Sequence, residues 1–474
     1  MILLINPPFS YGQLNSASPR CPPLGLAYIA AYLEKFDYKV RVLDAFALNL
    51  TEDEVKYEIK KANPDIVGIT GVTSNFHQII NISSMVKDID NEIKVVIGGP
   101  HATIEPESCF INNSVDYAVI GEGEVTFKEL VDSIIIKKRN IKTIKGIAFK
   151  LEKKIIKTPY RPFIKNLDSL PLPAYHLLPM KSYRPYATFD IGKRFSSMIT
   201  SRGCPFSCAF CSSSAMFGHT YRANSPERVL TEIELLHEKY KIDHIYFQDD
   251  EFTILHSRTE NICDMMMERK LNIIWECLSR TDHISKELLM KMKKAGCVSI
   301  VYGIESGCPK ILGKINKNIP QKQIINACKW AKEAEIMCKI SFIIGFPWES
   351  EKEIINTINF AKSLKADYAN FSVLTPFSNT EIYKTIKKMK LLISNDWNRF
   401  SPYQKVPVIK TKYLNNNEIT KWAGKAHLNF YLRPSFLLKK LFFFNRLYFN
   451  KTYAKRNIKA GFDLIKMNIN RFIE

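Results

Sequence analysis

The strongest constraint on this chain is a group of three cysteines, Cys204, Cys208 and Cys211, at the spacing C-x3-C-x2-C. Cysteine thiolates are the usual ligands of iron–sulfur clusters. Three thiolates on a cubane of four irons leave one iron open, and an open iron can bind a small molecule. Zinc is the alternative, but zinc normally has four ligands in closed pairs, and no fourth Cys or His follows at a matching distance. We therefore expect a [4Fe–4S] cluster on these cysteines.

The residues around the cysteines form a repeating series of strands and helices. Apolar strands are expected at 197–200, 244–247, 272–278, 298–302, 339–344 and 368–373. Polar residues or glycines follow these strands, as they do at the catalytic face of a β/α barrel. Between the first two strands, Ser225 and Pro226 fit the N-cap and the first position of a helix. The series predicts a partial (β/α)6 barrel over residues 191–385.

The first 145 residues alternate between short apolar strands and helical stretches. Strands are expected at 1–6, 39–43, 65–70, 94–97 and 117–120. Buried β-branched runs separated by helices predict a doubly wound, Rossmann-like parallel sheet. Ligands of such sheets bind beyond the carboxyl ends of the strands, where this chain places glycines that let a backbone approach a ligand closely. The candidates at these ends are Pro7, Thr73, Ser74, Gly98, Gly99, Gly121 and Gly123.

The cysteine loop and the segments after the later strands resemble the radical S-adenosylmethionine (SAM) enzymes. The resemblance implies that the open iron chelates SAM, that SAM is cleaved by one electron, and that the resulting adenosyl radical abstracts hydrogen from a substrate. It also implies a set of SAM-binding residues: Phe210, Asp249, Asp250, Glu251, Arg280, Glu305 and Ile344. For the three consecutive acids a solvated turn is the alternative, and Arg280 could instead pair with Asp282. No catalytic residue is assigned.

Four N-terminal segments resemble the first domain of cobalamin-dependent radical SAM enzymes: Asn6–Pro8, Pro22–Leu26, Gly98–His101 and Gly121–Glu124. The resemblance implies cobalamin bound near Pro7, Thr73, Ser74, Gly98, Gly99, Pro100, His101, Gly121, Glu122 and Gly123. The D-x-H-x-x-G signature, whose His ligates cobalt, is absent after the first strand. His77 and His101 are the nearest substitutes, and for each we favour a structural or surface role over ligation.

The chain is thus predicted to be an α/β protein with four parts. Residues 1–145 form the cobalamin-binding domain, and residues 146–190 form a hairpin and a linker with six prolines between 159 and 185. Residues 191–385 form the radical SAM barrel. Residues 386–474 form a basic, aromatic-rich helical region.

Net charge is +21, and much of the excess lies near the C-terminus. Residues 421–474 contain twelve Lys and Arg but only Asp463 and Glu474 as acids. Residues 428–449 mix aromatic and basic side chains, as an interfacial helix on anionic lipid would. We therefore predict that residues 425–474 dock on a membrane. A helix that packs on the barrel is an equally supported alternative, and a lysine-rich proteome would explain the charge without any partner.

The cysteine content and the N-terminal sequence provide evidence on the cellular compartment of the protein. Eight of the eleven cysteines lie outside the cluster loop among apolar neighbours, as buried free thiols do. A cluster and free thiols indicate a reducing cytoplasm, with peripheral membrane association as a further expectation. The N-terminus lacks the basic region and cleavage site of a signal peptide, and no apolar run reaches the ~18 residues of a membrane span. An electron donor such as flavodoxin or ferredoxin is expected, and a nucleic-acid partner is not.

The leading hypothesis is methylation of an unactivated carbon of a small molecule or lipid, with ring formation and rearrangement as other outcomes. A cobalamin-free enzyme acting on a lipid or tetrapyrrole is an alternative. A methylthiotransferase-like tRNA-modifying enzyme would explain the basic charge, but it would carry a second three-cysteine cluster in a domain that has only Cys21 and Cys109. A non-catalytic cobalamin sensor would leave the cluster loop without a purpose.

Overall fold

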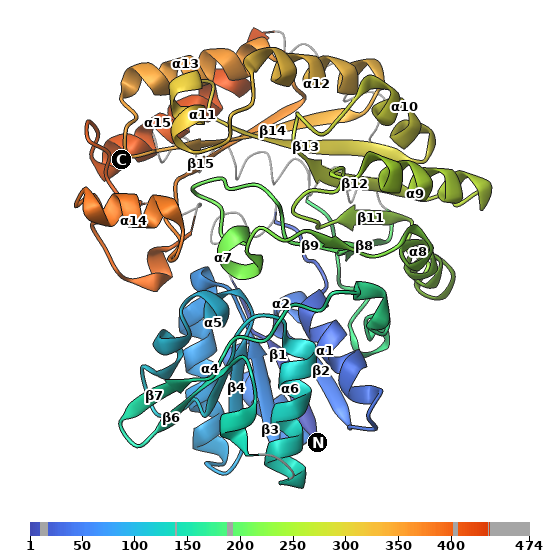
Figure 1. Ribbon diagram of the computed structural model, residues 1–474, viewed down its shortest axis with the longest axis vertical. Coiled ribbons are helices and arrows are strands. Elements are labelled where there is room, and N and C mark those ends of the chain that lie inside the picture. The colour runs from blue at the N-terminus through green and yellow to red at the C-terminus, as the bar shows by residue number, and fades with distance from the viewer. Residues whose placement is uncertain (10–17, 138–139, 187–192, 402–405, 435, 437–474) are drawn as a thin grey trace. The chain divides into compact units, whose positions relative to one another are not determined.

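The computed structural model describes residues 1–9, 18–137, 140–186, 193–401, 406–434 and 436. The chain divides into two compact units, each described here by itself (Figure 1). The first comprises residues 1–10, 20–183 and 215–218, and the second contains most of the remainder from residue 184 onward.

The first unit is built on a seven-stranded sheet in the order β2-β1-β3-β4-β5-β6-β7. Its strands are β1 (Ile2–Asn6), β2 (Val40–Asp44), β3 (Ile66–Thr70), β4 (Lys94–Gly98), β5 (Tyr117–Val119), β6 (Ile147–Leu151) and β7 (Lys154–Lys157). The strands β1 to β5 are parallel, which confirms the predicted doubly wound sheet. The hairpin β6–β7 pairs antiparallel with β5 and so extends this sheet, a pairing that the sequence did not predict.

Helices cover the sheet of the first unit. They are α1 (Leu24–Glu34), α2 (Ala45–Leu48), α3 (Glu52–Ala62), α4 (Phe76–Ile89), α5 (Pro100–Ile104) and α6 (Gly123–Val131). The helix α1 packs against α6, and α3 packs against α4. Because β1 lies between two parallel neighbours, four of its five residues are buried, which explains its continuous apolar run.

The second unit is built on six parallel strands in the order β15-β14-β13-β12-β11-β8, which confirms the predicted partial barrel. They are β8 (Phe195–Met198), β11 (His244–Phe247), β12 (Ile274–Ser279), β13 (Cys297–Glu305), β14 (Met337–Ile344) and β15 (Tyr368–Val373). Residues of β14 alternate between buried and partly exposed, as expected when helices cover only one face.

Figure 1 shows helices of the second unit in an arc outside its strands. They are α8 (Pro226–Tyr240), α9 (His256–Glu268), α10 (Lys286–Lys294), α11 (Pro309–Lys314), α12 (Gln321–Glu333) and α13 (Glu351–Ser363). The predicted start of α8 is confirmed, because the Ser225 side chain accepts a hydrogen bond from the Arg228 N–H and Pro226 is the first helical residue. The short α7 (Ser213–Phe217) follows the cluster loop.

The helical C-terminal region contains α14 (Glu381–Lys388) and α15 (Asn416–Tyr431). The helix α15 packs on β15 and α13, with Phe430 fully buried. The Arg433 guanidinium continues this contact by donating to the Lys362 and Ala366 carbonyls at 3.2 and 3.0 Å. The packed helix, one of the two alternatives for this stretch, is therefore found for residues 428–431 at the end of α15, whereas Leu432 is 60% exposed. Residues 437–474 lie outside the described residues.

No helix in the described part of the chain is both long enough and apolar enough to cross a bilayer.

Candidate active site

The cluster loop starts just after β8, where β9 (Ser201–Arg202) pairs antiparallel with β10 (Arg222–Ala223). Backbone hydrogen bonds hold the loop from two sides. The Ala209 N–H donates to the Ile315 carbonyl at 2.9 Å, and the Ile382 N–H donates to the Ala209 carbonyl at 2.8 Å. The loop is thus fixed between the end of α11 and the start of α14.

The three cysteines of the loop are free, half-buried thiols. Burial raises the pKa of Cys204, and it raises the pKa of Cys211 to about 12, so these sulfurs need a cation to stabilise their thiolates. Within the described residues, no three Cys, His, Asp or Glu side chains converge on a single metal ion. The donor set fits a [4Fe–4S] cluster.

Two of the three predicted acids after β11 brace the protein itself. Asp249 accepts hydrogen bonds from the Thr200 N–H at 2.7 Å, the Thr200 hydroxyl at 2.6 Å and the Ser201 hydroxyl at 2.7 Å. Asp249 is 1% exposed. Its three hydrogen bonds hold the chain where the loop begins. Glu251 accepts from the Thr253 and Arg280 N–H groups, both at 3.0 Å. Asp250 lies on the surface and accepts from the Ser213 hydroxyl at 2.6 Å.

Arg280 lies beside the cluster loop. Its Nη1 is 3.6 Å from the Cys208 sulfur, and its guanidinium carbon is 3.7 Å from the centre of the Phe206 ring. It also forms a bidentate ion pair with Asp282 at 2.9 and 2.7 Å, which was the alternative left open by the sequence. The structure therefore places a fixed positive charge next to one of the predicted iron ligands.

Glu305, a predicted SAM-binding residue, forms a buried ion pair with Lys317, in which Nζ and Oε1 are 3.2 Å apart. Glu305 has a left-handed backbone with φ of 69°, and a Cβ on Gly303 would come within 2.5 Å of its carboxylate. The Lys317 carbonyl accepts from Arg280 at 3.4 Å, so the pair adjoins the cluster loop. The sequence analysis missed Lys317, and its only signal is a lysine in the Asn-rich turn after α11.

The turn after β14 lies against the cluster loop, because the rings of Phe210 and Phe346 have centroids 6.1 Å apart. Two predicted SAM-binding residues, Phe210 and Ile344, are thus brought to one place. Gly345 has φ of 100°, and its N–H and that of Phe346 donate to Oε2 of the buried Glu349 at 2.7 and 3.0 Å. Burial raises the pKa of Glu349 to about 8. Glu349 was also missed, although it follows the Gly-Phe-Pro turn closely.

Another buried carboxylate, Glu276, lies within the sheet of the second unit. The Lys339 ammonium is 2.7 Å from one oxygen, and His244 Nε2 is 3.2 Å from the other. Burial alone would raise the pKa of Glu276, but Lys339 and His244 lower it to about 2. Lys339 belongs to the partly exposed positions of β14, so these charges lie on the face that the helices leave open. Neither the pair nor its position was predicted.

In the first unit, two of the predicted glycines, Gly98 and Gly121, adjoin open space at the carboxyl ends of the strands. A Cβ on Gly121 would meet no atom within 4 Å, and one on Gly98 would meet only Val119 at 3.9 Å. Gly99, with φ of 90°, could not carry a Cβ, which would lie 2.7 Å from the Thr70 hydroxyl. The Gly121 N–H is held by the Thr103 hydroxyl at 3.0 Å. These strand ends leave room for the close approach of a ligand, as cobalamin binding requires.

His101 is fully buried, and both of its ring nitrogens have partners inside the first unit. Nδ1 lies 3.1 Å from the Thr73 hydroxyl, and Nε2 lies 2.8 Å from the Ser108 hydroxyl. Burial lowers the pKa of His101 to about 4, so the ring is neutral. This is the structural role favoured by the sequence. His77 is exposed on α4.

The remaining predicted cobalamin residues lie at or near the same strand ends. Pro7 directly follows β1, Thr73 and Ser74 lie between β3 and α4, and Pro100 is the first residue of α5. The Glu122 carboxylate accepts from the Ile164 N–H at 2.7 Å, and Gly123 begins α6.

Comparison with known proteins agrees with this geometry. The family model of the B12 binding domain matches residues 14–131, and that of the radical SAM superfamily matches residues 198–361. An uncharacterized methyltransferase of Pyrococcus horikoshii is 40% identical over 442 residues, which cover 93% of this chain and 94% of the relative. An anaerobic magnesium-protoporphyrin IX monomethyl ester cyclase of Rubrivivax gelatinosus is 27% identical over 446 residues, 92% of this chain and 78% of the relative.

Among solved structures, the cobalamin-dependent SAM radical enzyme OxsB matches with a TM-score of 0.74 and 17% identity, over all of this chain and 72% of that one. The radical SAM methyltransferase TsrM from Kitasatospora setae matches with a TM-score of 0.68 and 19% identity, over 82% of this chain and 74% of that one. At these identities the likeness concerns the fold.

The fold, the cysteine loop and the two matched domains define a radical SAM enzyme with a B12-binding domain. The chain belongs to this family, and its cofactors are a [4Fe–4S] cluster, SAM and cobalamin. The predicted fold class, enzyme class and cofactors are thereby confirmed.

Proposed function

We propose that the protein is a cobalamin-dependent methyltransferase that adds a methyl group to an unactivated carbon of an organic substrate. The observation that carries the proposal is the pairing, on one chain, of a three-cysteine radical SAM loop with a B12-binding domain. Its 40% identical relative is named a methyltransferase, and a hopanoid C-3 methylase of Methylococcus capsulatus is 25% identical over 387 residues. The cyclase relative makes ring formation the second candidate.

We assign the cluster to Cys204, Cys208 and Cys211. When bound, the cluster supplies the electron that cleaves SAM. The residues of the chain hold the loop in place and set the charge beside it. Asp249 ties down the strand that leads into the loop, and the Arg280 guanidinium places a positive charge 3.6 Å from the Cys208 sulfur.

We propose that SAM lies between the cluster loop and the ends of β11 to β14. Phe210 and the turn after Ile344 would flank its adenine. Lys317, which pairs with Glu305 and adjoins the loop, offers an ammonium group for the carboxylate of SAM. Asp250, at the surface, is the acid best placed to receive the amino group.

Cobalamin, when bound, supplies the carrier of the methyl group. We propose that it is held over Gly98, Gly99 and Gly121, and the open space beside Gly98 and Gly121 leaves room for its close approach. Because both nitrogens of His101 have partners within the protein, we expect this chain to hold cobalamin without a protein ligand on cobalt.

The test is anaerobic reconstitution of the full chain with iron, sulfide and hydroxocobalamin, followed by desalting. We expect a retained corrinoid spectrum, and, with dithionite, conversion of SAM to both 5′-deoxyadenosine and S-adenosylhomocysteine. Replacing all three loop cysteines with Ala should abolish iron binding and the formation of 5′-deoxyadenosine. Full iron and sulfide in that variant would overturn the cluster assignment. Loss of corrinoid on desalting, with the cluster intact, would overturn the cobalamin step.

We also propose that residues 437–474 attach the enzyme to an anionic membrane, which would bring it to a lipid or tetrapyrrole substrate. The support is the basic and aromatic sequence of this segment.

A further inference from the structure

The Arg280 side chain is held in one orientation by groups of the protein. Nε and Nη2 donate to the two carboxylate oxygens of Asp282 at 2.9 and 2.7 Å, and Nη2 also donates to the Lys317 carbonyl at 3.4 Å. The side chain of Arg280 is only 10% exposed. These bonds fix the plane and the direction of the guanidinium group from within the protein.

The third nitrogen of the group, Nη1, is directed at the cluster loop. It donates to the Cys208 sulfur at 3.6 Å, a usual distance for an acceptor larger than oxygen. The guanidinium carbon lies 3.7 Å from the centre of the Phe206 ring, and Phe206 stands between Cys204 and Cys208 in the chain. The His283 ring also packs on Phe206, with ring centres 5.1 Å apart. The N–H···S contact is therefore supported by packing on a residue of the loop itself.

Asp282 offsets only part of the positive charge at this sulfur. Its carboxylate binds the edge of the guanidinium group formed by Nε and Nη2, whereas the Cys208 sulfur faces Nη1. The Asp282 side chain is 24% exposed, compared with 10% for Arg280, so water screens the negative charge more strongly than the positive one. The field that the pair exerts on Cys208 is therefore positive.

We infer that Arg280 raises the reduction potential of the cluster. The inference rests on the proposed function, because it concerns the cluster assigned there to the loop cysteines. Reduction transfers one electron from a one-electron reductant to the cluster, which goes from the 2+ to the 1+ state. A positive charge and a hydrogen bond at a ligand sulfur stabilise the more negative state. This role differs from the contact with SAM that the sequence implied for Arg280.

The experiment measures the reduction potential of the anaerobically reconstituted full chain without SAM. Samples are poised at stepped potentials, and the reduced fraction is read from the electron paramagnetic resonance signal of the 1+ cluster. Arg280→Gln should lower the ratio of reduced to oxidised cluster at a fixed potential by about tenfold, a shift of about 59 mV for one electron. Asp282→Asn removes the opposing charge and should raise this ratio, by a smaller factor because Asp282 is the more exposed partner. An Arg280 that served only to contact SAM would leave both values unchanged.

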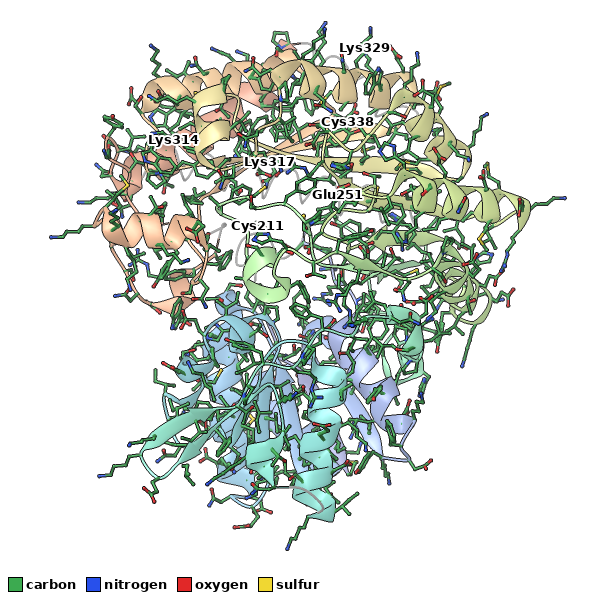
Figure 2. The ribbon with its side chains drawn as sticks, in the orientation of Figure 1. Cys211, Glu251, Lys314, Lys317, Lys329 and Cys338 are labelled. Carbon is green, nitrogen blue, oxygen red and sulfur yellow. The ribbon has the colours of Figure 1, made fainter. Side chains whose placement is uncertain are left out.

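Lys329→Gln is the matched control, because it also removes one positive charge. Lys329 is 69% exposed on α12, and Figure 2 shows it well separated from Cys211. Its potential should equal that of wild type. Unchanged potentials in Arg280→Gln and Asp282→Asn, or shifts of the same sign in both, would overturn the inference. If Arg280→Gln holds no cluster, a raised ratio in Asp282→Asn supports the inference and an unchanged or lowered ratio refutes it. A wild type that assembles no cluster would contradict the proposed function, and the inference would fall with it.

Discussion

Glu349 supports the turn after β14, and its burial makes a specific prediction about stability and pH. Its Oε2 accepts both N–H groups of the turn, and its pKa is raised by burial from 4.5 to about 8. Because the folded pKa lies above the unfolded one, the folded state binds more protons between these values, and stability falls as pH rises. Glu349→Gln keeps the acceptor and removes the titration. The amide NH2 takes the place of the carboxyl O–H at Oε1, which has no hydrogen-bond partner among the described residues.

The magnitude follows from the two pKa values. At pH 7 the Glu349 carboxyl is protonated in the folded state and ionised in the unfolded state. Keeping this proton lowers the free energy of unfolding by roughly 3 kcal/mol, at ~1.4 kcal/mol per pKa unit. Glu349→Gln should therefore stabilise the second unit by up to about 3 kcal/mol at pH 7, or roughly 5 °C in apparent melting temperature. At pH 4.5 the two proteins should melt together. Glu349→Ala, which removes the acceptor, should destabilise by about 1–3 kcal/mol per lost hydrogen bond.

The assay is differential scanning fluorimetry from pH 4.5 to 8 on protein freed of iron. Glu353→Gln is the control on the same segment, since hydrogen bonds from Ser350 hold the pKa of Glu353 below its usual value. Because that lowered pKa titrates below pH 4.5, the Glu353→Gln variant should melt below wild type by a nearly constant offset from pH 5 to 8, in contrast to the pH-dependent offset of Glu349→Gln. A Glu349→Gln protein that melts below wild type at pH 7, or with the same offset at every pH, would refute the reasoning.

Four further predictions concern the site and the tail. Asp249→Asn replaces a carboxylate that takes three hydrogen bonds, and it should lower the iron content per chain through a loss of about 1–3 kcal/mol in the loop. Lys317→Met should weaken SAM binding and destabilise by about 3–5 kcal/mol, and a second change, Glu305→Gln, should restore the melting temperature but not the SAM affinity. His101→Gln should leave the electron paramagnetic resonance spectrum of bound cob(II)alamin unchanged, and a changed axial signal would contradict a structural His. A chain ending at residue 436 should fail to float with anionic vesicles that carry the full chain at low salt, and equal flotation would locate the membrane contact elsewhere.

The strand order of the second unit was predictable because each strand is followed by its own helix and turn signal. The start of α8 is an example, since Ser225 and Pro226 act through bonds within four residues. The β6–β7 hairpin was also visible, but its antiparallel pairing with β5 was not. A hairpin carries no signal of which sheet edge it joins, since the pairing depends on residues such as Tyr117 and Phe149 that are far apart in the chain.

The cluster cysteines could be predicted because the chemistry lies in their spacing. The acids after β11 could be located from the sequence, but their roles could not be predicted. Those roles depend on hydrogen-bond donors that lie far away in the chain. Asp249 meets donors 48 and 49 residues earlier, and Glu251 meets the Arg280 N–H 29 residues later. Lys317 could not be singled out from the sequence either, because only its ion pair with Glu305 links it to the predicted site. The SAM and cobalamin contacts stay predictions.

The hydrogen bonds of the buried acids explain why the sequence around the loop contains so many of them. A half-buried cluster loop cannot be held by apolar packing alone, because its backbone must remain open to SAM and its sulfurs must reach iron. Asp249, Glu251 and Glu349 each accept two or more hydrogen bonds from the segments that border the loop. Carboxylates do this with fixed geometry, at the cost of the raised pKa values seen for all three. The acids therefore act first as supports that shape the loop and the segments that border it.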